Sequence, residues 1–152
     1  MSDEAIEGVF PNLVASGYRM TSPATQDYNC IAWAAGVDSA WWWPDEFHFA
    51  FWPVTVPRTV TLDAFLAAYE TLGYIACADG QVEYGYEKIA LYGDKNQQPT
   101  HAARQVHSGK WTSKLGPSED IEHNTVEALH GDHYGGVLKF MKRPLRSIPP
   151  RT

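Results

Sequence analysis

The sequence has little cysteine, since only Cys30 and Cys77 occur among its 152 residues. Two cysteines do not make the disulfide framework of a small secreted domain, so we expect free thiols and a reducing compartment. The chain also lacks any apolar run near the ~20 residues that a membrane-spanning helix needs. These shortages exclude disulfide-rich and membrane-spanning classes of protein.

Basic side chains are scarce as well: 12 Lys and Arg stand against 18 Asp and Glu, so the formal net charge is -6. A nucleic-acid-binding surface needs clustered Lys and Arg to contact phosphates, so the acidic balance argues against such a partner. The only basic cluster lies near the C-terminus, where we expect a solvated chain end: Lys139, Lys142, Arg143 and Arg146.

The N-terminus shows no secretory signal, because residues 1–4 are acidic and lack the basic and apolar regions of a signal peptide. We therefore expect a cytoplasmic protein with no membrane partner. Export as an effector, by a route that reads no N-terminal signal, stays open.

A hydrophobic content of 44% with 20% charged residues is ordinary for a globular protein, and the length suits one domain. We expect that domain at residues 25–143, after an irregular lead-in at 1–24 and before a flexible tail at 144–152. The lead-in contains residues that interrupt every candidate helix: Gly8, Pro11, Gly17 and Pro23.

A short apolar helix is expected at residues 30–35, with Cys30 on its first turn. Asp27 or Asn29 can cap this helix, and Gly36 ends it. The positive end of the helix dipole lowers the pKa of a thiol, so Cys30 is a candidate nucleophile that we expect to be alkylated faster than Cys77. The alternative is that Cys30 is a small core residue.

The remaining pattern predicts an α+β fold with N-terminal helices packed on an antiparallel sheet. A helix is expected at residues 62–72, with Thr61 as its N-cap. Short turns between successive extended segments favour an antiparallel meander. The strands are expected at 74–77, 86–92, 100–106, 110–115 and 137–141, with a further helix at 121–129.

Residues 41–53 are rich in Trp and Phe and have prolines near both ends, which excludes a regular amphipathic element. Aromatic side chains bury a large area and gather in cores and at binding surfaces. The segment is therefore either a loop pinned over the core or a wall of a substrate cleft. In the second case Trp43, with Trp33 from the cysteine helix, is a candidate substrate-binding residue.

Two motifs, Tyr28-Asn29-Cys30-Ile31-Ala32-Trp33 and Thr100-His101-Ala102-Ala103, resemble the nucleophile helix and histidine strand of papain-like cysteine hydrolases. The similarity is to the compact NlpC-type and CHAP-type branch of that superfamily, and to small bacterial proteins of unknown function. It implies a papain-like architecture, a Cys30 nucleophile and a His101 base.

The resemblance also implies a residue that orients the imidazole, from the strand after the histidine strand. Ser113 or Thr112 occupies that place, and Asp120 is a stronger acceptor just beyond it. In a competing register, Glu87 or Lys88 takes the place of the principal histidine, and His101 becomes the third member of the site.

The reaction expected from these residues is amide hydrolysis or acyl transfer through a Cys30 thioester, as in a peptidase, amidase or deamidase. The Cys30 backbone N–H and a Gln26 or Asn29 side chain are candidate oxyanion donors. The expected substrate is a peptide, protein or cell-wall amide. No cofactor is required, and the pattern does not predict an oligomeric state.

Two readings of a different class remain open. One is a non-enzymatic interaction domain with a Trp-rich face. The other is a metal-binding protein that uses His130-Gly131-Asp132-His133 with Glu119, Asp120, Glu122 and His123, although no metalloprotease or paired-cysteine motif is present.

Overall fold

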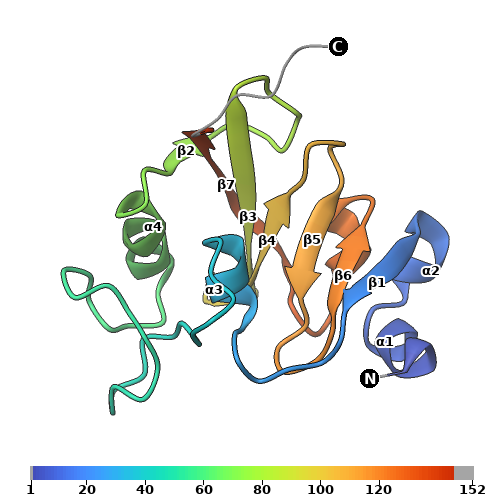
Figure 1. Cartoon of the computed structure of the whole chain (residues 1–152), viewed down its shortest axis with the longest axis horizontal. Helices are drawn as coiled ribbons and strands as arrows, with labels where there is room; N and C mark the ends of the chain where they lie inside the picture. Colours follow the sequence, from blue (N-terminus) through green and yellow to red (C-terminus); the bar gives the residue numbers. More distant parts are fainter. Residues whose placement is uncertain (1, 146–152) are drawn as a thin grey trace.

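A computed structural model describes residues 2–145, which form a mixed α/β fold around an open seven-stranded sheet (Figure 1). The strand order is β1-β6-β5-β4-β3-β7-β2, and every neighbouring pair is antiparallel. The antiparallel sheet expected from the sequence is confirmed. Its strands are β1 (Tyr18–Ser22), β2 (Ile75–Cys77), β3 (Tyr86–Gly93), β4 (Pro99–Gln105), β5 (Trp111–Lys114), β6 (Asp120–His123) and β7 (Gly136–Pro144).

The helices are few and short: α1 (Asp3–Val9), α2 (Asn12–Ser16), α3 (Cys30–Ala34), α4 (Leu62–Glu70) and a single 3-10 turn, η1 (Val126–Leu129). In Figure 1, α3 lies in front of the sheet near β4, α4 lies to its left, and α1 and α2 lie at the opposite end of the molecule. None of these helices is long and apolar enough to cross a membrane.

Alternation along the strands divides the buried residues between two hydrophobic clusters. Leu91 of β3 and its partner Ala102 of β4 pack in the cluster that holds α3 and α4. The adjacent pair along the same two strands, Ala90 of β3 and Ala103 of β4, packs in the cluster that holds α1, α2 and η1. The sheet therefore has an α3 face and an η1 face, and neighbouring residues on one strand serve different clusters.

The prediction of an irregular lead-in at residues 1–24 is wrong, because this stretch forms α1, α2 and strand β1 at the edge of the sheet. Ser2 caps α1 by accepting a hydrogen bond from the Ala5 N–H at 3.2 Å. Ile6 and Leu13 are fully buried, so packing on the η1 face stabilises helices that the breaker residues argue against.

The helix predicted at 121–129 is also wrong, since β6 occupies its first half and η1 its second. Strand pairing decides the outcome: β6 pairs with β5 on one side and β1 on the other. Strand β7 extends to Pro144, so the predicted tail begins later than residue 144, and its residues 146–152 lie outside the described part of the chain.

Candidate functional site

Cys30 begins α3, as expected, and Asn29 is the N-cap. The Asn29 side chain accepts hydrogen bonds from the backbone N–H groups of Ala32 at 3.2 Å and Trp42 at 3.0 Å. Its amide nitrogen donates to the Trp42 carbonyl at 2.7 Å. Asn29 therefore joins the start of α3 to the aromatic loop, and Gly36 ends the helix with a φ of +86°.

The Cys30 thiol is buried, with 6% of the residue exposed, and it is not disulfide-bonded. Burial raises its pKa to about 11. This effect outweighs the lowering of the pKa by the backbone N–H groups of Ala102, Ile31 and Cys30 and by the Lys114 ammonium. The resting thiol is therefore protonated, and the expectation that Cys30 is alkylated faster than the half-buried Cys77 has no support from the structure.

His101 lies fully buried on β4 and is joined to Ser113 of β5, as the sequence predicts for an imidazole and its orienting residue. His101 Nε2 and Ser113 Oγ are 3.0 Å apart. Ser113 Oγ also lies 2.8 Å from His123 Nε2, and His123 Nδ1 lies 2.8 Å from the Thr125 carbonyl oxygen. The hydrogen-bond chain thus runs across three strands to η1.

The direction of this chain follows from its last acceptor. A carbonyl oxygen only accepts, so His123 Nδ1 carries a proton, and burial lowers the pKa of His123 to about 4 and keeps its Nε2 bare. The Ser113 hydroxyl then donates to His123 and accepts from His101 Nε2–H. Burial also lowers the pKa of His101 well below its usual value, so its Nδ1 has a free lone pair and no hydrogen-bond partner.

Cys30 and His101 are not joined by a hydrogen bond. The direct partner of His101 on β3 is Tyr92, which packs in the η1-face cluster, whereas Ala102 packs with Cys30. The imidazole thus lies on the η1 face and does not face Cys30. The two groups share a neighbourhood all the same, because the Ala102 amide acts on the thiol.

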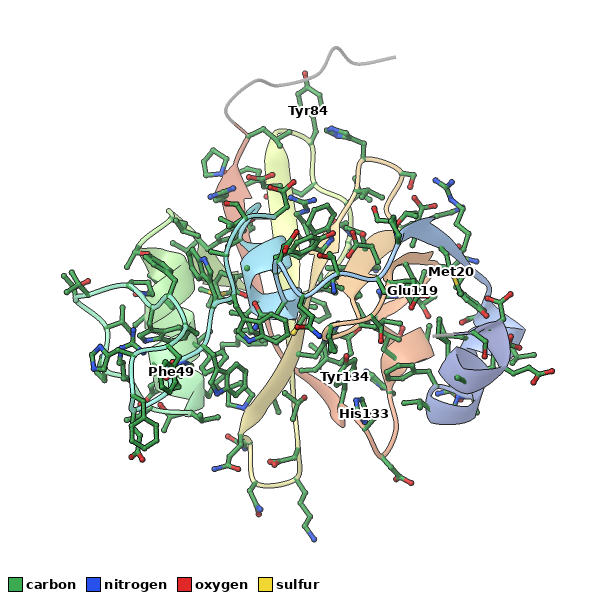
Figure 2. The ribbon with its side chains drawn as sticks, turned by 60° about the horizontal axis from the view of Figure 1, so that its bottom comes forward. Met20, Phe49, Tyr84, Glu119, His133 and Tyr134 are labelled. Atoms are coloured by element: carbon green, nitrogen blue, oxygen red, sulfur yellow. The ribbon has the colours of Figure 1, made fainter. Side chains whose placement is uncertain are left out.

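Tyr134 connects the two groups more directly. Its ring stacks on the His101 imidazole, with 4.0 Å between centroids and 9° between planes. Cys30 also contributes to the raised pKa of Tyr134. Figure 2 shows Tyr134 beside His133 below the α3 ribbon, at the end of the sheet where β4 begins. Tyr134 belongs to the η1-face cluster and therefore covers the imidazole on that face.

The strands diverge at this end of the sheet. The β4–β5 pairing covers only Arg104 with Thr112 and Gln105 with Trp111. Beyond Arg104 the strands are bridged by the His101–Ser113 side-chain contact. The backbone N–H of Ala102 lies in this unpaired stretch, which leaves it available to the Cys30 thiol.

The predicted substrate-binding residues have separate partners in the structure. Gln26 is exposed, and the Asn29 side chain is committed to Trp42. Trp33 donates its indole N–H to Thr112 Oγ1 at 3.2 Å and lies under the Arg104 guanidinium. Trp43 meets the Phe65 ring edge-on. Their roles in binding a substrate stay predictions.

The other candidates for the third site residue have different partners. Glu87 forms an ion pair with Arg143, and Lys88 forms ion pairs with Asp79 and Glu83. Both residues of the competing register are therefore held in ion pairs. Asp120 accepts a hydrogen bond from the Tyr28 hydroxyl at 2.6 Å on the α3 face. Ser113 is thus the candidate that contacts His101.

The metal-site reading finds no geometric support in residues 2–145, where no three His, Cys, Asp or Glu side chains gather as the ligands of one ion. His123 is instead part of the buried chain, and His133 packs against Phe10.

A cavity of about 730 Å³ lies on the η1 face, away from α3. Its walls come from the loop before β3, the β4–β5 turn and the start of η1, with Trp111 and Phe140 among its apolar residues. Thr125, the last acceptor of the histidine chain, is one of its lining residues.

A family model described as a domain of unknown function (DUF7689) matches residues 19–142. The chain belongs to this family. The match runs from β1 to β7 and includes Cys30, His101, Ser113 and His123. No curated protein and no solved structure gives a significant match.

Sequence reasoning missed two residues around the site of this DUF7689 chain, Lys114 and Tyr134, and considered His123 only as a metal ligand. The helix predicted at 121–129 hid the alternation of Ile121 and His123 on one face of a strand, which buries His123. Tyr134 lies in a Gly-rich loop, and no local pattern indicates that its ring reaches His101.

Proposed function

We propose that this chain is a cysteine-dependent amide hydrolase or acyltransferase of papain-like architecture, with Cys30 as nucleophile and His101 as base. The observation that carries the proposal is the unpartnered Nδ1 of His101. A fully buried acceptor without a donor is costly, and a catalytic role accounts for it. Ala102, which follows His101 on β4, donates its backbone N–H towards the Cys30 thiol.

In the proposed reaction, the Cys30 proton moves to His101 Nδ1 as Sγ attacks the carbonyl carbon of an amide. The C–N bond then breaks, and the imidazolium returns the proton to the leaving amine. Water or a second amine cleaves the resulting thioester and restores the thiol. Ser113 accepts the Nε2–H bond of His101 throughout and holds the ring in one tautomer.

The reaction requires a rearranged state that brings the thiol and the imidazole together, because at rest they lie on different faces of the sheet, are both neutral and buried, and are not hydrogen-bonded to each other. Movement of the Tyr134 ring off the imidazole is the step that we propose for opening. Peptides, proteins and cell-wall amides are the proposed substrates, and the cytoplasm is the proposed site of action.

Acylation by p-nitrophenyl acetate tests the proposal, with intact-mass and peptide analysis to locate the acetyl group. We expect a thioester on Cys30 that forms faster as the pH rises towards 11, because the thiolate fraction grows. Cys30→Ala should lose this acylation at every pH, His101→Gln should lose it near neutral pH, where the thiol needs a base, and Cys77→Ala is the matched control that should keep it. Acylation that survives Cys30→Ala, or that is confined to Cys77, would contradict the proposal.

A second candidate is an interaction domain, favoured by the aromatic loop between α3 and α4. Phe49 is 90% exposed and Val54 99%, although the loop is held firmly by Arg58, which bonds the Asp45 carboxylate and the Ala50 carbonyl. Rigid display of large apolar side chains marks contact surfaces. Figure 2 shows Phe49 far from Tyr134, so this surface is separate from the proposed catalytic site.

Sedimentation velocity over a range of concentrations tests self-association through this loop. A dimer that Phe49→Ser abolishes and Cys30→Ala preserves would support the second candidate. A monomer at every concentration would count against self-association through this loop.

A further inference from the structure

Lys114 of β5 is fully buried on the α3 face, although lysine is seldom buried. Its ammonium donates three hydrogen bonds, to the carbonyl oxygens of Thr25 at 2.7 Å, Gly116 at 2.6 Å and Ser118 at 2.6 Å. An ammonium has three N–H donors, so these acceptors saturate it.

These hydrogen bonds join two segments far apart in the sequence. Thr25 lies in the segment that leads into α3, whereas Gly116 and Ser118 form the turn between β5 and β6. The Tyr28 ring, in the same leading segment, lies 5.1 Å from Lys114 Nζ. Lys114 therefore fixes the five residues that precede Cys30 against the sheet.

The acceptors of Lys114 are neutral carbonyls, so the hydrogen bonds do not cancel its charge. Burial lowers the pKa of the Lys114 ammonium, and the charged groups that oppose this effect are Asp120 on β6, Glu119 before it, and Asp27 before α3. Around the thiol, Tyr69 and Tyr134 have pKa values raised well above the usual value by burial, and His101 is neutral. The Lys114 ammonium also lowers the pKa of Cys30.

We propose that Lys114 is a positioning residue for Cys30, which holds the segment before α3 in place and supplies the positive charge that stabilises the Cys30 thiolate. This role deepens the proposed function and rests on it, since a stabilised thiolate matters only where Cys30 reacts. The residue acts on the nucleophile and not on the substrate.

Lys88 of β3 is the matched control within the same protein. It is 2% exposed, and its ammonium bonds the Asp79 carbonyl and lies within 3.4 Å of the Asp79 carboxylate and 3.5 Å of Glu83. Its ammonium thus forms ion pairs with two carboxylates, whereas the hydrogen bonds of Lys114 are to neutral carbonyls.

The experiment measures the iodoacetamide alkylation rate of Cys30 between pH 8 and 10, with Cys77 in the same chain as the internal reference. Lys114→Gln should slow alkylation of Cys30 by about tenfold, the effect of one pKa unit on the thiolate fraction. Lys114→Arg should restore the rate to within about threefold of the wild type, because arginine keeps the charge. Lys88→Gln should leave the Cys30 rate unchanged.

A purely structural Lys114 predicts the opposite sign, because a loosened segment exposes the thiol and speeds its alkylation. A faster or unchanged rate in Lys114→Gln would therefore overturn the proposal. If circular dichroism shows that Lys114→Gln does not fold, Lys114→Arg decides: a wild-type rate supports the role of the charge, and a change beyond tenfold in either direction rejects it.

The two proposals fail separately. Retained acylation in His101→Gln near neutral pH would reject the hydrolase and leave the Lys114 result standing. Loss of acylation in His101→Gln near neutral pH, together with unchanged alkylation in Lys114→Gln, would reject the Lys114 role alone.

Discussion

On the α3 face of β5, burial lowers the pKa of Lys114, and three backbone carbonyls together with the nearby Asp120 carboxylate stabilise its ammonium. On the η1 face of the same strand, Ser113 joins two imidazoles that are buried by staying neutral. Adjacent residues of one strand thus meet the cost of burial in different ways. Replacement of the Lys114 side chain should therefore destabilise the fold, whereas the two neutral imidazoles should make the fold sensitive to acid.

Lys114→Met should have the largest effect on stability. Methionine fills a similar volume but leaves the carbonyls of three half-buried residues without their donor, so we expect a loss of about 3–5 kcal/mol in the free energy of unfolding. Urea denaturation measures it. Lys88→Met is the control and should lose less, because its carboxylate partners are partly exposed and become hydrated. Equal losses would remove the distinction between the two lysines.

Acid should destabilise the fold through the η1 face. The folded-state pKa of His123 is about 4 and that of His101 is also lowered, so the unfolded chain binds protons first as the pH falls below 6.5. The free energy of unfolding is highest above about pH 6.5 and falls towards pH 4, with a loss of roughly 3 kcal/mol from His123 alone.

The slope of unfolding free energy against pH, measured from pH 7.5 to 4.5, isolates this effect. His123→Gln should flatten the slope whatever its absolute stability, because glutamine does not titrate. An unchanged slope would show that other groups, such as paired carboxylates, control the acid response.

Ser113→Ala and Thr112→Val compare neighbouring residues that face opposite sides of the sheet. Removing the Ser113 hydroxyl leaves one imidazole donor and one imidazole acceptor unpaired, at an expected loss of about 2 kcal/mol. Thr112 accepts one bond from the half-buried Trp33 indole, so Thr112→Val should lose about 1 kcal/mol. A larger loss for Thr112→Val in thermal and urea melts would reverse the assignment.

Phe49→Ser should have the smallest effect, because the side chain is almost wholly exposed and its removal creates no cavity. We expect a change within about 0.5 kcal/mol. A larger loss, measured at a protein concentration where the chain is monomeric, would mean that the aromatic loop supports the α3 face.

Much of the fold was predictable because its signals are local. The sheet strands follow short extended segments with clear turns, and the caps Asn29 and Thr61 precede apolar helices and accept hydrogen bonds as expected. The contact of His101 with a residue of the next strand was implied by the family resemblance, which left Ser113 and Thr112 open. The lead-in and β6 were missed because their structure depends on burial against partners distant in the sequence.

The sequence by itself determined the antiparallel sheet and which residues bear candidate chemistry, since strand alternation, capping and turns act within a few residues. The tertiary structure alone decided that His101 turns away from α3, that Tyr134 covers it, and that Lys114 is buried near Cys30. Those outcomes depend on strand order and on where two β-strands diverge. They arise from contacts between residues tens of positions apart, which local sequence patterns do not encode.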